Sequence, residues 1–261
     1  MQEQHTDRSE PPRLRLDGIT VRFGGLTALD SVSLDIPAGR IIGVMGPNGA
    51  GKTTLFNVIC GVFPPSEGRL ELDGQGFRPK PHLLTRHGVA RTLQGLGLFP
   101  GLTVRENVAA GLAAQSRRRL DLLSLPGAVR HESRIAAQAM KALDALGIAG
   151  YAGALPDTLP YGIRKKAALA RALVCEPRLL LLDEPAGGLG HEDIGELAEI
   201  IREVPRTGCS VVLVEHHVDL VMDVCDRIAV LDFGRLIAEG TPTEVGADPA
   251  VADAYLGVEV A

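Results

Sequence analysis

The chain has 261 residues, of which 45% are hydrophobic and 23% are charged, a composition typical of a globular protein with a large buried core. Its 27 Lys and Arg against 32 Asp and Glu give a net charge of −5, which argues against broad electrostatic capture by nucleic acid or an anionic membrane. The polar start of the chain lacks a signal-peptide core, and no apolar run approaches the ~18 residues of a membrane span. We therefore expect a soluble cytoplasmic protein that reaches a membrane only through a partner.

The cysteines favour a reducing compartment. None of them forms a C-x-x-C pair, and each lies in a mostly apolar stretch, so reduced and buried thiols are a better interpretation than a metal or redox site. They are Cys60, Cys175, Cys209 and Cys225.

The first third of the chain predicts strands and one helix. Residues 1–12 are expected to form a disordered lead-in that ends at Pro11 and Pro12. After it, apolar periodicity predicts two antiparallel strands separated by a Gly-Gly turn, a buried strand, a helix and a short strand. These elements cover residues 14–23, 31–36, 40–45, 52–60 and 69–72.

Helical periodicity replaces the strands between about residues 94 and 161. Helices are expected over 104–112 and 132–146, the second with Ile135, Ala139, Leu143 and Leu146 on one face. Strands and helices then alternate, which predicts a mostly parallel sheet with helices on both faces. The predicted elements, beginning with a helix, cover 162–174, 179–182, 192–204, 211–214, 218–225 and 228–231.

A phosphate-binding motif of the form G-x-x-x-x-G-K-[ST] follows the predicted strand 40–45. Its glycines let the backbone wrap around phosphate oxygens, and the following helix presents its positive end to the same anion. Lys52 can then reach the β- and γ-phosphates, while the Thr53 hydroxyl ligates Mg²⁺. ATP and Mg²⁺ are therefore expected at Gly46, Pro47, Asn48, Gly49, Ala50, Gly51, Lys52, Thr53 and Thr54.

A second element supplies two carboxylates. The apolar run 179–182 predicts a buried strand that delivers Asp183 and Glu184 at its carboxyl end, where ligands bind in open α/β sheets. Beside a phosphate loop, Asp183 is expected to hold Mg²⁺ directly or through water. Glu184 is expected to orient and deprotonate the attacking water.

In order and spacing, these motifs resemble those of the ATP-binding cassette (ABC) ATPases. The matching elements are Gly46–Thr54, Gln94, Leu159–Ile163, Asp183–Glu184 and His216. The resemblance spans about residues 14–257. It implies an α/β fold of the P-loop NTPase class and the ABC ATPase type, with a mixed sheet core, an antiparallel N-terminal β subdomain and an inserted helical lobe. The ATP-binding core would comprise residues 13–93 and 162–261, and the helical signature lobe residues 94–161.

The resemblance implies roles for single residues. Gln94 looks like the family's glutamine-loop residue, which contacts Mg²⁺ and the attacking water and relays movement into the helical lobe. His216 looks like the switch histidine that contacts the γ-phosphate, whereas His217 is expected to be a helix-start residue. Phe23 lies where the family places an aromatic that stacks on adenine; a core residue at a strand end is the alternative, since stacking needs only an aromatic face.

The family signature is altered here. Leu159, Pro160, Tyr161, Gly162 and Ile163 stand where Leu-Ser-Gly-Gly-Gln is usual, and those residues bind the γ-phosphate held by the opposite subunit. Pro160 removes a hydroxyl and an amide donor, and Ile163 removes the glutamine. Gly162 still allows close approach and the helix N-terminus keeps its partial positive charge. We expect intact nucleotide binding and slower hydrolysis than a full signature would give.

Two neighbouring features raise further questions. Arg164, Lys165 and Lys166 follow the signature and oppose the helix dipole, so either an anion lies nearby or they form a solvated basic helix end. The loop 186–190 lacks the Asp or Asn that the family usually has near Gly190, which puts communication between the two ATP sites in doubt.

Several stretches resemble the longer ATP-binding subunit of branched-chain amino acid importers. They are residues 22–26, 98–108, 159–162 and 254–257, together with the insertion between 111 and 132. Tyr161 is a feature of that branch, so only Pro160 and Ile163 count as weakening changes. Arg117–Arg119 in the insertion are expected to form a surface hairpin rather than a patch facing lipid or a permease.

This branch implies the motor subunit of an importer for branched-chain amino acids or a similar small polar solute. Its partners would be a second cassette in a homo- or heterodimer, transmembrane permease subunits and, indirectly, a solute-binding protein, with no nucleic acid. The protein would be cytoplasmic and peripheral at the inner face of the cell membrane. The alternatives are a regulatory, weakly hydrolysing subunit paired with a competent cassette, and a soluble ABC ATPase without a transport role.

Overall fold

The computed structural model describes residues 11–92, 95–113 and 126–256. Its strands are β1 (Leu14–Phe23), β2 (Leu26–Ile36), β3 (Ile41–Met45), β4 (Glu67–Leu72), β5 (Gln75–Phe77), β6 (Val89–Arg91), β7 (Leu179–Asp183), β8 (Ser210–Val214), β9 (Arg227–Asp232) and β10 (Arg235–Gly240). Its α-helices are α1 (Lys52–Cys60), α2 (Val104–Ala113), α3 (Pro126–Ala145), α4 (Tyr161–Leu173), α5 (His191–Glu203), α6 (Val218–Val224), α7 (Pro242–Gly246) and α8 (Pro249–Leu256). Short 3₁₀ segments cover Pro81–His87, Ala149–Tyr151, Pro156–Thr158 and Val204–Thr207.

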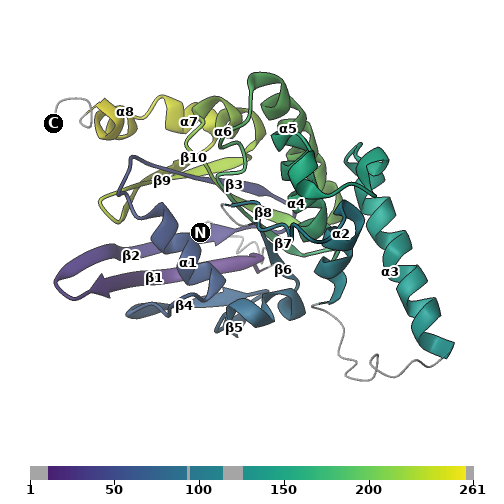
Figure 1. Ribbon diagram of the computed structural model, residues 1–261. Helices are drawn as coiled ribbons and strands as arrows, with labels where there is room; N and C mark the ends of the chain where they lie inside the picture. Colours follow the sequence, from purple (N-terminus) through teal and green to yellow (C-terminus); the bar gives the residue numbers. More distant parts are fainter. Residues whose placement is uncertain (1–10, 93–94, 114–125, 257–261) are drawn as a thin grey trace, which may run out of the picture.

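An antiparallel sheet of order β2-β1-β4-β5 forms the N-terminal part of the chain (Figure 1). As predicted, β1 and β2 are joined by a turn at Gly24 and Gly25, and Phe23 pairs with Leu26 across it. Gly24 has a φ of 59°, a conformation that glycine adopts at little cost.

The central sheet has the order β10-β9-β3-β8-β7-β6. Its strands β9, β3, β8, β7 and β6 are parallel, and β10 is antiparallel to β9. Successive residues of a strand point to opposite faces, and both faces are covered here. Leu179 and Leu181 pack into one hydrophobic cluster, whereas Leu180 and Leu182 pack into the other. The continuous apolar run of β7 follows from this double burial.

Helices lie on both faces of the central sheet, as predicted, but they cover the two faces unequally. Only one face of the central sheet is covered mainly by helices, namely α2 to α6. The other face packs on α1 and the antiparallel sheet in a single cluster. The apolar faces of β1, β2 and β4 are buried against this side of the central sheet. Together with α1, they cover it where a second layer of helices would otherwise be needed. The prediction of an α/β fold with a mixed sheet and an antiparallel N-terminal part is confirmed.

Helices α2, α3 and α4 pack together at one side of the molecule, away from the β1–β2 hairpin (Figure 1). A capping box starts α2: the Thr103 hydroxyl accepts from the Glu106 amide at 3.3 Å, and the Glu106 carboxylate accepts from the Thr103 amide at 2.7 Å. On α3, Ala139 and Leu143 are fully buried, as the predicted apolar face requires. The helix begins at Pro126 rather than Glu132.

The structure also bears on the predictions made for the cysteines, the N-terminal lead-in and membrane spans. The four cysteines are free and buried, as predicted, and burial raises the pKa of Cys209 and Cys225 to about 12. The lead-in residues 1–10 lie outside the described residues. Within the described ranges, no helix is long and apolar enough to cross a membrane.

Candidate functional site

Two glycines shape the loop between β3 and α1. Gly46 has a φ of 147°, and a Cβ there would lie 2.1 Å from the Leu231 carbonyl oxygen; Gly51 has a φ of 103°, and its Cβ would lie 2.8 Å from Leu29 Cδ2. Larger residues therefore fit neither position. Gly51 precedes the first residue of α1 and no side chain caps that helix. The loop and the helix N-terminus together present the backbone donors that bind phosphate in such motifs.

Lys52, the first residue of α1, lies inside this loop. Its side chain is buried, and Nζ donates to the carbonyl oxygens of Gly46 at 2.6 Å and Pro47 at 2.9 Å. Burial lowers the pKa of Lys52, and the negative charge of Glu184 partly offsets this. The ammonium group is thus held at the loop by two carbonyl oxygens, which phosphate oxygens can replace.

Glu184 continues directly from β7 at the same edge of the sheet as the loop. Strand β7 pairs with β8, and β8 with β3, so the carboxyl ends of the three strands adjoin. Glu184 has a φ of 47°, and its amide donates to the Val214 carbonyl at 2.8 Å. This conformation is rare for a non-glycine residue and is typical of functional sites. It turns the chain sharply where β7 ends.

The environment of Asp183 suits a cation. Burial raises the pKa of Asp183, and the nearby charges of Glu184 and Glu215 raise it further, while Arg91 lowers it. A half-buried carboxylate beside two others gains from a bound cation. Thr53, on the first turn of α1, supplies an exposed hydroxyl. Carboxylate and hydroxyl oxygens are ligands that Mg²⁺ accepts, usually with several waters, so the residues present fit this ion.

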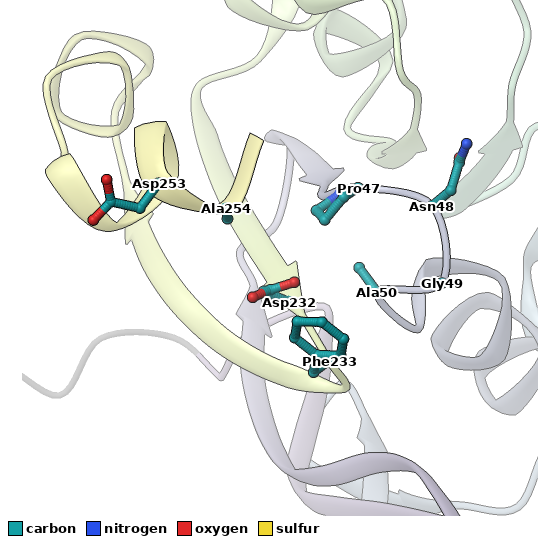
Figure 2. A pocket seen from close by; sticks show the side chains of 8 residues that line it. All are labelled: Pro47, Asn48, Gly49, Ala50, Asp232, Phe233, Asp253 and Ala254. Carbon is teal, nitrogen blue, oxygen red and sulfur yellow. The ribbon is translucent and has the colours of Figure 1, made fainter. Parts of the chain in front are cut away.

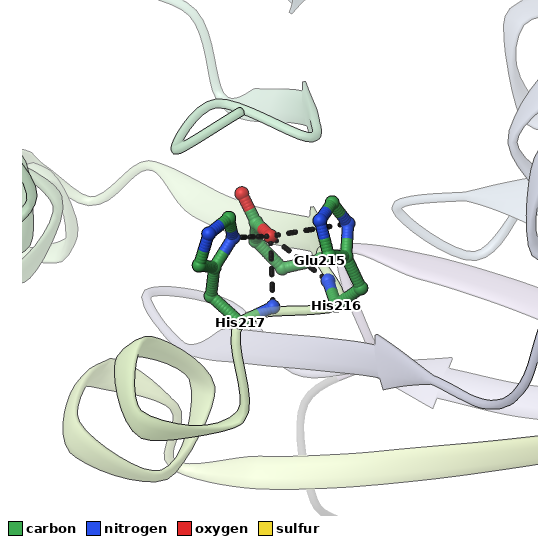
Figure 3. A group of neighbouring side chains, drawn as sticks. All are labelled: Glu215, His216 and His217. Carbon is green, nitrogen blue, oxygen red and sulfur yellow. Dashed lines mark hydrogen bonds and ion pairs between the residues drawn. The ribbon is translucent and has the colours of Figure 1, made fainter. Parts of the chain in front are cut away.

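Glu215 joins the loop after β7 to the loop after β8. Its carboxylate is fully buried, and it accepts from the backbone amides of Ala186 at 2.7 Å, His216 at 2.8 Å and His217 at 3.1 Å. The His217 ring lies 3.0 Å away through Nδ1 (Figure 3). Burial alone would raise the pKa of Glu215, but these hydrogen bonds hold it below its usual range. A charged carboxylate therefore ties the two loops together.

His216 projects from this network while its neighbour starts a helix (Figure 3). Its Nδ1 lies 3.8 Å from Glu184 Oε1 and 3.8 Å from Glu215 Oε2, and its side chain is 55% exposed. His217 is the N-cap residue of α6, which confirms its expected position at a helix start. The structure thus brings His216 and Glu184 together, with an accessible imidazole beside the carboxylate.

The signature residues lie at the start of α4. Pro160 is the N-cap residue, and α4 begins at Tyr161. Gly162 is buried, and a Cβ there would lie 2.6 Å from Asp193 Oδ1. The missing side chain of Gly162 therefore makes room for α5 of the same chain.

The basic residues after the signature are not a solvated helix end. Lys166 pairs with Glu196 on α5, and its side chain is only 17% exposed. Arg164 and Lys165 lie 5.4 and 5.5 Å from the centre of the Tyr161 ring. Lys165 also donates to the Glu184 carbonyl at 3.3 Å, so it links the signature helix to the carboxylate loop.

Phe23 lies at the end of β1, outside the hydrophobic core. Its side chain is 50% exposed and meets Phe63 edge to face, with ring centroids 5.3 Å apart. The alternative of a core residue was therefore wrong. An exposed aromatic face is what stacking on a base requires, and the adenine contact stays a prediction.

Two predicted features cannot be placed in the structure, and one can. Gln94 and Arg117–Arg119 lie outside the described residues. Gly190 is described: it is the exposed N-cap residue of α5, with no side-chain cap.

Two residues of the site were missed by sequence reasoning. Glu215 follows the apolar strand β8, so an acidic residue at the carboxyl end of a buried strand could have indicated it. Tyr255, whose hydroxyl accepts from the Gly46 amide at 3.0 Å, carries no local signal because it lies 209 positions further along the chain.

The fold and the site together define a P-loop nucleotide-binding ATPase. The ABC transporter profile matches residues 29–187, and a profile described as branched-chain amino acid ATP-binding cassette transporter matches residues 235–261. The chain therefore belongs to the ABC transporter family of ATP-binding subunits, which hydrolyse ATP to power transport.

Individual relatives agree with this assignment. The chain is 36% identical to the high-affinity branched-chain amino acid transport ATP-binding protein BraF of Pseudomonas aeruginosa, over 94% of this chain and 98% of BraF. A nucleotide-free cassette from an ABC transporter superposes with a TM-score of 0.82 at 30% identity, covering 93% of this chain and 98% of that one. A dimeric cassette bound to ADP and Pi superposes with a TM-score of 0.74 at 25% identity, covering 88% and 98%. None of these comparisons supports the regulatory or the non-transport alternative.

Proposed function

We propose that this chain is the ATP-hydrolysing motor subunit of an importer for branched-chain amino acids or a similar small polar solute. The observation that carries the proposal is the meeting of Lys52, Asp183, Glu184 and His216 at the carboxyl ends of three adjacent strands. The match of residues 235–261 to the branched-chain amino acid cassettes supports the choice of solute.

In this proposal the phosphate loop Gly46–Thr54 holds the triphosphate, and Phe23 stacks on adenine. Thr53, Asp183 and Gln94 would hold Mg²⁺, which neutralises charge on the β- and γ-phosphates when bound. Gln94 enters through the family resemblance, and Thr53 and Asp183 through the donor set described above.

Glu184 is the proposed general base. Its carboxylate takes a proton from a water whose oxygen bonds to the γ-phosphorus, while the bond to the β,γ-bridging oxygen breaks to give ADP and phosphate. His216, beside Glu184, would donate to a γ-phosphate oxygen. Lys52 would exchange its carbonyl partners for phosphate oxygens.

The proposed partners are a second cassette and transmembrane permease subunits. In the dimer, Leu159, Pro160, Tyr161, Gly162 and Ile163 of one subunit would face the nucleotide of the other. A solute-binding protein would act through the permease, and this chain would remain peripheral at the inner face of the membrane.

Reconstitution tests the motor role and the solute. The chain is purified together with permease subunits and a second cassette from the same organism, placed in vesicles and supplied with MgATP. Uptake of radiolabelled leucine that requires ATP and this chain supports the proposal. ATP-driven uptake of other solutes but not of leucine, isoleucine or valine would reject the solute class alone; no ATP-driven uptake of any solute would reject the motor role.

Lys52→Ala is expected to weaken ATP binding roughly 10- to 100-fold, because a charged partner of the phosphates is lost. Isothermal titration of MgATP into the purified chain measures this. Lys80→Ala, at an exposed position, is the matched control and should bind like the wild type. Equal affinity in wild type and Lys52→Ala would remove Lys52 from the phosphate site.

Restoring the signature with Pro160→Ser and Ile163→Gln together is expected to raise ATP turnover about 2- to 10-fold, the effect of one or two added hydrogen bonds. Ile163 is only half-buried, so a glutamine amide can turn toward solvent. Steady-state phosphate release by the dimer is the measurement. An unchanged rate would mean that the N-terminus of α4 suffices without the serine and glutamine.

A further inference from the structure

Two segments near the end of the described chain form hydrogen bonds with the backbone of the phosphate loop. The turn between β9 and β10 holds one end: the Gly234 amide donates to the Ala50 carbonyl at 3.0 Å. Helix α8 holds the other: the Gly46 amide donates to the Tyr255 hydroxyl at 3.0 Å. A pocket of about 200 Å³ separates residues of the phosphate loop from residues of the β9–β10 turn and of α8 (Figure 2). It is lined by Pro47, Asn48, Gly49, Ala50, Asp232, Phe233, Asp253 and Ala254.

The Tyr255 hydroxyl provides a hydrogen-bond acceptor for the buried backbone amide of Gly46. Gly46 is buried, and its φ of 147° turns the chain out of β3. A buried amide without an acceptor costs about as much as a lost hydrogen bond, and the phenol oxygen supplies that acceptor. Because this amide is used by Tyr255, the phosphate-facing donors must come from later residues of the loop.

The same glycine links Tyr255 to the phosphate-binding lysine. The Gly46 amide is held by Tyr255, and its carbonyl oxygen accepts from Lys52 Nζ at 2.6 Å. A rotation of the Gly46 backbone would therefore displace the lysine partner as well as the loop. Tyr255, on α8, packs against the hydrophobic core, and burial raises the pKa of its phenol, so the hydroxyl stays neutral.

We propose that Tyr255 is a positioning residue for ATP binding: its hydroxyl fixes Gly46 and thereby sets the geometry of the phosphate loop. This inference rests on ATP binding at the loop, as proposed above. It gives Tyr255, which lies in the segment matched by the branched-chain amino acid cassettes, a direct role at the nucleotide site.

Tyr255→Phe tests this inference, because it removes the hydroxyl and keeps the ring that packs against the core. The KM for ATP and the Kd for ADP are expected to rise roughly 3- to 10-fold, the effect of one lost hydrogen bond. The kcat at saturating ATP should change less than about 2-fold, because Glu184 and His216 are untouched. Amide hydrogen exchange at Gly46 should accelerate in the nucleotide-free protein.

Tyr151→Phe is the matched control. It removes a phenol hydroxyl from an exposed tyrosine of the helical lobe and should leave the Kd for ADP and the exchange of Gly46 unchanged. A Tyr255→Phe protein with a lower Tm but wild-type KM and Kd would overturn the inference, since the hydroxyl would then serve only stability. Wild-type exchange at Gly46 would overturn it as well.

The proposed function is tested separately in the same experiments. The wild-type Kd for nucleotide tests whether the loop binds ATP at all. The exchange of Gly46 in the nucleotide-free protein tests the Tyr255 contact whatever the wild type binds.

Discussion

Glu184→Gln should reduce ATP turnover by at least about 100-fold while ATP binding is retained, since general-base catalysis contributes this much or more. The backbone contacts that place residue 184 involve its amide, which donates to Val214, and its carbonyl, which accepts from Lys165. Glutamine keeps both contacts and nearly the same shape, so the substitution removes the negative charge of the side chain and its capacity to accept a proton. With binding intact and hydrolysis blocked, the variant should accumulate as an ATP-bound dimer.

Two measurements check this result. Phosphate release gives the turnover, and gel filtration with and without MgATP gives the dimer. Glu199→Gln, at an exposed position on α5, is the matched control and should hydrolyse ATP like the wild type. If Glu184→Gln turns over ATP at the wild-type rate, Glu184 is not the base.

Glu215→Ala is expected to destabilise the fold by on the order of 3 to 5 kcal/mol. The substitution leaves the amides of Ala186, His216 and His217 without the carboxylate that they donate to. An unsatisfied buried donor such as the Ala186 amide costs about 1 to 3 kcal/mol, and the side chain leaves a cavity as well. The amides of His216 and His217 are only partly buried, so each of them adds less. The midpoint of urea unfolding measures the loss, with the m-value as a check that the unfolding remains two-state. Glu199→Ala, at the same exposed position as before, should have the wild-type midpoint.

The same carboxylate predicts a dependence of stability on pH. The pKa of Glu215 in the folded chain is lower than the reference value of 4.5. Its contribution to the free energy of unfolding is therefore fully present above about pH 4.5 and is lost as the pH falls through the lower folded pKa. The stability difference between wild type and Glu215→Gln should narrow over that acidic range. A constant difference would mean that Glu215 is not charged in the folded protein.

Residues close together in the chain determined much of the fold. The loop Gly46–Thr54 and helix α1 were predicted from a short pattern, because glycines at fixed offsets and a following helix are local properties. The strand β7 and its two carboxylates were predicted from one apolar run. Strands β6 and β10 were not, because β6 has only three residues and β10 is half-buried without a clean alternation.

Contacts between distant residues were decided only by the tertiary structure. The Tyr255 hydroxyl meets Gly46 across 209 positions, and Glu215 meets the Ala186 amide across 29. No local pattern encodes these pairs, because they depend on which strands adjoin and on how α8 returns to the sheet. The sequence by itself determined that a phosphate loop, a carboxylate pair and a histidine are present. The packing of the strand ends decided that these residues meet. It also decided that Glu215 joins the loops after β7 and β8, and that the Tyr255 hydroxyl accepts from Gly46 at the start of the phosphate loop.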